Sequence, residues 1–108
     1  MLFRSTIGGA KQLKSLTVTT TASETTLNGS VISISPKAAS GNSFVYKAAA
    51  KAQDVTAGKN ISSGWTAIAS GDEITVTAAS STTITVAEIN ADNKVIGSGS
   101  ATINKKTS

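Results

Sequence analysis

Acidic side chains are the first candidates for chemistry in this chain. Asp72 and Glu73 are adjacent, and with Glu88 and Asp92 they could line a cation site or act as a general acid and base. Solvation of polar hairpin turns accounts for the same acids without any ligand. We therefore predict no metal site, no catalytic residue and no cofactor.

Nucleophilic catalysis lacks its usual partners in this sequence. There is no histidine and no cysteine, so the commonest general base, the commonest zinc ligand and any disulfide framework are missing. Serines are abundant, but only a lysine could then activate their hydroxyl groups, and no Ser-x-x-Lys spacing occurs. These features predict that the chain is not an enzyme.

Three aromatic residues, Phe44, Tyr46 and Trp65, could form an exposed platform on which a sugar stacks. In a small β domain such side chains more often lie in the core, and Trp65, the largest, is expected to fix one end of it. The predicted core framework consists of Phe44, Tyr46, Trp65, Ile74, Val76, Ile84, Val86 and Ile89.

Net charge and hydropathy restrict the partners. The formal charge is +4 and the sequence pI is about 9.6, yet no basic helix or run of bases interleaved with aromatics is present, so we predict no nucleic-acid binding. No apolar run reaches the ~18 residues of a membrane span. Residues 1–4 are too short an apolar stretch for a signal peptide. We expect a chain that enters no membrane and folds in the cytoplasm where it is made.

The hydrophobic pattern is that of strands. From Leu16 onward apolar and hydroxyl side chains alternate, with polar turns every 8 to 12 residues or so. The segment 48–59 is expected to be a loop or a single helical turn. We predict an all-β fold, a small Ig-like β-sandwich or barrel of about seven strands. The strands are expected near 16–19, 31–35, 44–47, 61–68, 73–77, 83–89 and 95–103.

Two irregularities interrupt this alternation. Ala87 and Ile89 have the opposite parity to Ile84 and Val86, which predicts a bulge or a strand covered on both faces. In the last strand Gly97 and Gly99 stand at core-facing positions. They indicate a bend or the close approach of another backbone.

The first 15 residues differ from the rest. They contain three basic residues and no acid, include the pair Gly8 and Gly9, and show no lasting period. We predict an extended N-terminal arm over residues 1–15 and one β-domain over residues 16–108. Exposed apolar side chains in the arm would tuck onto the domain or dock on a partner.

Four segments carry a resemblance to a known family. They read GNSFVYK (41–47), SGWTA (63–67), VAEI followed by DNKV (86–95) and GSATI (99–103). Over about residues 17–104 the chain resembles a small β module of tailed-bacteriophage head-fibre and capsid-decoration proteins, which is also appended to some phage capsid proteins. The matching framework positions are Tyr46, Trp65 and Ile89, with the turn 92–94. The glycines and serines of 95–99 depart from the alanine and lysine of that family.

The resemblance implies a non-enzymatic virion structural protein on the capsid exterior, made in the host cytoplasm. Its implied partners are the major capsid protein and further copies of itself, with a trimer as one arrangement. The expected capsid or subunit contacts are Leu2, Phe3, Arg4, Ile7, Lys11 and Lys14. The alternative is an Ig-like carbohydrate- or cell-surface-binding module, for which a host-surface glycan is the ligand.

Overall fold

The computed structural model describes residues 14–35, 37–53, 55–61 and 64–107, which form eight strands and no helix. The predicted all-β class is confirmed. Within these ranges no helix could cross a membrane. The strands are β1 (Lys14–Ser15), β2 (Thr17–Ala22), β3 (Gly29–Ser35), β4 (Ser43–Ala49), β5 (Thr66–Ile68), β6 (Asp72–Thr75), β7 (Thr83–Ile89) and β8 (Val95–Thr102).

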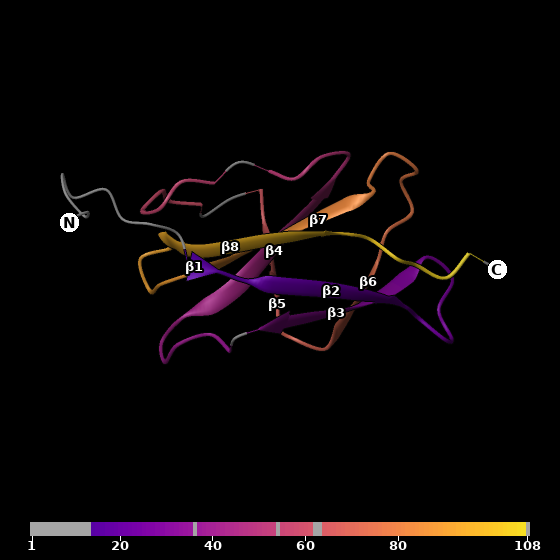
Figure 1. The fold of residues 1–108 in the computed structure, drawn as a ribbon, viewed down its shortest axis with the longest axis horizontal. Helices are drawn as coiled ribbons and strands as arrows, with labels where there is room; N and C mark the ends of the chain where they lie inside the picture. The colour runs from indigo at the N-terminus through magenta and orange to yellow at the C-terminus, as the bar shows by residue number, and fades with distance from the viewer. Residues whose placement is uncertain (1–13, 36, 54, 62–63, 108) are drawn as a thin grey trace, which may run out of the picture.

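The strands form two packed sheets (Figure 1). The larger has the order β1-β8-β7-β4-β5 and the smaller the order β2-β3-β6. All pairings are antiparallel except that of β1 with β8, which is parallel, with Lys14 opposite Gly97. The chain changes sheets at Leu16, between β1 and β2, so the predicted arm ends in a strand of the larger sheet.

Alternation of side chains explains how a threonine-rich chain builds a core. In β2 the side chain of Val18 is buried, while Thr17 and Thr19 are exposed. β-branched threonine keeps the strand conformation on the outer face, and each buried Val or Ile contributes about 1.5–3 kcal/mol. The core between the sheets contains Leu16, Val18, Ile32, Ile34, Phe44, Ile68, Ile74, Val76, Ile84, Val86 and Ile103.

A second apolar cluster covers the outer face of the larger sheet. The connection between β4 and β5 folds over β7 there and contributes Val55 and Trp65. Strand β7 is therefore buried on both faces, and its register also shifts between Glu88 and Ile89. Burial on both faces explains the parity change, because Ala87 and Ile89 both belong to the second cluster. The register shift comes after Ala87, and the residue it skips is Ile96 of β8, so it does not explain the change. The buried members of the cluster are Val45, Ile61, Ala87, Ile89 and Val95.

Trp65, which was expected to fix one end of the core, packs against the second cluster and not between the two sheets. It is half-buried against the second cluster, just before the short strand β5. The outer face of β7 needs apolar cover, and an indole ring supplies it while one edge stays in water. The segment 48–59 has no helical turn in its described part.

The two glycines of β8 lie beneath the crossover at Leu16. The amide of Leu16 donates to the carbonyl of Ser98 at 3.0 Å. A Cβ atom at Gly99 would lie 2.9 Å from the carbonyl carbon of Leu16, and one at Gly97 would lie 3.0 Å from the carbonyl oxygen of Lys14. The glycines therefore mark a close approach of two backbones.

Candidate functional site

The structure does not bring the four candidate acids together. Asp72 and Glu73 are exposed at the start of β6, Asp92 is exposed in the turn before β8, and Glu88 is buried in β7. The carboxylate of Asp72 accepts a hydrogen bond from the amide of Ala69 at 2.9 Å, which closes its turn. Across the described ranges no three histidine, cysteine or acidic side chains are grouped to hold a metal ion.

Glu88 instead is the buried centre of a hydrogen-bonded cluster whose other members are partly or fully exposed. Its Oε1 accepts from the ammonium of Lys14 at 3.1 Å. Its Oε2 accepts from the backbone amide of Ala39 and from the side-chain amide of Asn42, both at 3.0 Å. We call these four residues the Glu88 cluster. It joins β1, β7 and the segment that leads into β4.

The surroundings of Glu88 favour its charged form. The side chain has no exposed surface, while that of Lys14 is 37% exposed. Burial alone would raise the pKa of Glu88, but the hydrogen bonds from Ala39, Asn42 and Lys14, with the positive charge of Lys14, outweigh it. Together they hold the pKa below the ordinary glutamate value of 4.5.

This lowered pKa predicts a loss of stability in acid. A carboxyl group whose pKa is lower in the folded than in the unfolded state stabilises the fold above the unfolded value of about 4.3. That contribution is lost as the pH falls through the folded pKa. We expect the free-energy difference between wild type and Glu88→Gln, measured by urea unfolding from pH 7 down to pH 2, to shrink below about pH 4.3. A difference that stays constant over this range would contradict the assignment.

Sequence reasoning missed the Glu88 cluster as a unit. The available signal was an acid flanked by the apolar residues Ala87 and Ile89. Lys14, one of the expected contact residues, pairs with Glu88 within the same chain. The other expected contacts, Leu2, Phe3, Arg4, Ile7 and Lys11, lie outside the described residues.

The predicted framework residues are divided between the two apolar clusters. Phe44, Ile74, Val76, Ile84 and Val86 lie in the core between the sheets, and Tyr46 packs against it. Ile89 and Trp65 belong to the second cluster. The three aromatic side chains therefore do not form one stacking platform.

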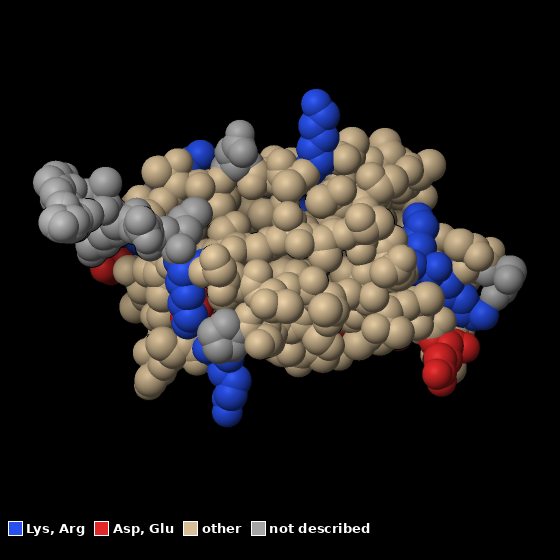
Figure 2. Space-filling view, in the orientation of Figure 1, with Lys and Arg blue, Asp and Glu red and all other residues tan. Residues whose placement is uncertain are grey.

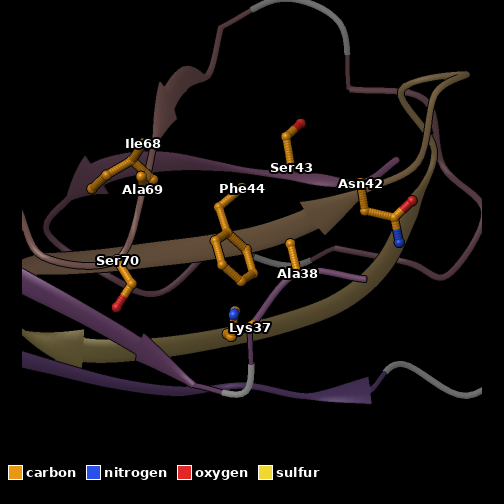
Figure 3. Close-up of a pocket in the computed structure, with 8 residues that line it drawn as sticks. All are labelled: Lys37, Ala38, Asn42, Ser43, Phe44, Ile68, Ala69 and Ser70. Atoms are coloured by element: carbon orange, nitrogen blue, oxygen red, sulfur yellow. The ribbon is translucent and has the colours of Figure 1, made fainter. Parts of the chain in front are cut away.

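An open cleft of about 380 Å³ lies between the start of β4 and the end of β5 (Figure 3). The ring of Phe44 points into it, toward Ala38 and Lys37. No acidic side chain is among its described lining residues, so these offer no acid–base pair. The lining consists of Lys37, Ala38, Asn42, Ser43, Phe44, Ile68, Ala69 and Ser70.

Basic side chains do not gather into one patch on the face shown in Figure 2. They lie at separate places, toward both ends and along the edges of the molecule. On this face the visible basic side chains are therefore spread apart, and most of the visible surface is uncharged.

Fold and site together define a small two-sheet β-sandwich with a buried carboxylate, that of Glu88, which accepts three hydrogen bonds from the same chain. A family model narrows this class: the model of the S-layer protein SbsC C-terminal domain matches residues 15–106. That range includes nearly all of the described sandwich, and the chain belongs to this family of S-layer structural domains. Comparison with curated proteins and with solved structures gives no match.

The family match corrects the resemblance to phage proteins. The predicted capsid-decorating role, the major capsid protein as partner and the virion as location are wrong, because the chain belongs to a bacterial S-layer family. The segments behind the resemblance are parts of strands and the turns or loops beside them. Gly41 and Asn93 have φ angles of 84° and 62°. Many tight turns need a positive φ angle, and glycine and asparagine adopt it most easily, so the same residues recur at turns of unrelated proteins. Such motifs indicate a β-sandwich and not a particular family.

Proposed function

We propose that this chain is a structural domain of a bacterial S-layer, at the cell surface, and that it is not an enzyme. The family match over residues 15–106 is the observation that carries the proposal. The match also favours the cell-surface role in the alternative predicted from the sequence, an Ig-like carbohydrate- or cell-surface-binding module. A sandwich whose buried carboxylate is fully occupied by internal donors fits a structural role better than a catalytic one.

The partners in this role are other S-layer subunits. A surface array repeats the same contacts many times, so contacts that are weak one by one hold a subunit in place when several act together. A threonine-rich exterior suits such contacts, because it keeps the strands extended and offers hydroxyl groups to neighbours. The aromatic side chains give no support to a glycan-binding version of the role, since Phe44 and Tyr46 pack inward.

Fractionation of the source bacterium tests the proposal. A protein carrying this chain with an epitope tag should appear in the cell-envelope fraction, be released from it by a chaotropic denaturant, and be labelled by antibody on intact cells. A cytoplasmic enzyme followed in the same fractions is the control. Recovery of the tagged protein with that enzyme, or in phage particles, would overturn the proposal.

A further inference from the structure

The described chain enters and leaves the sandwich at opposite ends (Figure 1). Strand β1 begins at one end, and β8 runs parallel to it toward the other, where the C-terminal segment leaves. Tension between the two ends therefore draws β1 and β8 in opposite directions along a shared axis. In this shear geometry the hydrogen bonds of the ladder must lengthen together, whereas a strand peeled from one end loses them one at a time.

A second tie lies further along the same path, between β2 and the segment that follows β8. The hydroxyl group of Thr20 donates to the carbonyl of Thr102 at 2.6 Å and accepts from the amide of Asn104 at 2.9 Å. The side-chain amide of Asn104 also donates to the carbonyl of Thr20 at 3.2 Å. Thr20 lies in β2, so the chain just after the entry point is bound to the chain just before the exit.

The exit segment is held by the sandwich as well. The amide of Asn28 donates to the carbonyl of Lys106 at 2.8 Å, and the amide of Lys106 donates to the carbonyl of Gly29 at 3.1 Å. The ammonium of Lys105 donates to the carbonyl of Val76 at 2.7 Å. A force applied at the C-terminal side is therefore passed to the start of β3 and to Val76, just after β6, before β8 can separate from its neighbouring strands.

The Glu88 cluster fixes the entry side. In the described part of the chain, β1 forms two residue pairs with β8, Lys14 with Gly97 and Ser15 with Ser98. The ammonium of Lys14 reaches past β8 to Glu88 in β7, and Glu88 is itself held by Ala39 and Asn42. A short strand thus gains an anchor on a third strand and on a loop.

We propose that the β1–β8 ladder, the Thr20–Asn104 tie and the Glu88 cluster form a mechanical clamp. The clamp lets this domain carry tension along its long axis, a function beyond a structural place in an S-layer. The inference stands on the connectivity of the described chain and does not depend on the family.

Single-molecule force spectroscopy tests the clamp, and the absence of cysteine in the chain allows handles at chosen positions. A Ser15→Cys/Thr107→Cys variant is pulled in shear. A Ser15→Cys/Asp92→Cys variant shares one anchor but loads β1 and the start of β8 from the same end. All three positions are exposed. At equal force we expect the shear pair to unfold about tenfold more slowly. Equal rates, or faster unfolding in shear, would overturn the clamp.

Glu88→Gln in both handle pairs tests the role of Glu88. Loss of the charged hydrogen bond to Lys14 should make unfolding in shear about tenfold faster and reduce the difference between the two geometries. A residue that merely stabilises the fold would change both rates by the same factor, and that result would remove Glu88 from the clamp. Glu73→Gln, at an exposed acid, is the matched control.

The outcomes separate the clamp from the proposed function. Force spectroscopy uses the isolated chain, so a weak response to shear would overturn the clamp and leave the cell-envelope result unchanged. A strong response with the chain found in the cytoplasm would overturn the S-layer role alone.

Discussion

Gly99→Ala is expected to destabilise the domain by about 3 kcal/mol, the upper end for overpacking a tight site. The added methyl group would occupy the space of the Leu16 backbone, with its carbonyl carbon at 2.9 Å and its Cβ at 3.1 Å. Backbone cannot rotate away as a side chain can. The crossover that carries the chain from β1 to β2 would therefore shift, and Leu16 would leave the core.

Urea unfolding followed by the fluorescence of Trp65 measures this effect. Ser100→Ala is the matched control, because position 100 is the next exposed residue of the same strand and the change removes only a hydroxyl group. The control should lie within about 0.5 kcal/mol of wild type. A Gly99→Ala variant as stable as Ser100→Ala would show that the two backbones are not in contact.

Glu88→Ala is expected to cost about 1.5–3 kcal/mol, the contribution of hydrogen bonds to a charged group, because the Lys14 ammonium can turn to water after the change. The change leaves the amide of Ala39, the side-chain amide of Asn42 and the ammonium of Lys14 without this acceptor. It also opens space beneath β1. Thermal and urea unfolding measure the loss. Glu73→Ala removes an exposed acid and should lie within about 0.5 kcal/mol of wild type.

A double-mutant cycle separates the ion pair from the rest of the cluster. Lys14→Met should cost less than Glu88→Ala, because the Lys14 ammonium has access to water and Glu88 keeps its bonds to Ala39 and Asn42. The double variant should be more stable than the sum of the single losses predicts. Strict additivity would mean that Lys14 and Glu88 do not interact in solution.

The sequence alone determined the class of fold and most of the strands. It did not predict β1, and of the expected strand near 61–68 only Thr66–Ile68 forms β5. Alternation in segments such as 31–35 and 83–86 has a period of two, and a strand places alternate side chains on opposite faces wherever it occurs. Turn residues such as Asn93 act on their own backbone within a few residues. Local rules of this kind need no knowledge of the partner strand, and the all-β class follows from them.

Only the tertiary structure decided which distant residues meet. Lys14 and Glu88 are 74 residues apart, and nothing local to either predicts that β8 lies between their strands. The position of Trp65 on the outer face of the larger sheet likewise depends on how the β4–β5 connection folds. The contact of Gly99 with the crossover at Leu16 could not be predicted locally either. The alternation of side chains along a strand and the residue types in a turn describe each segment separately. Sheet order, the burial of a charge and the path of tension depend on which segments pack together, and that is settled by the whole chain.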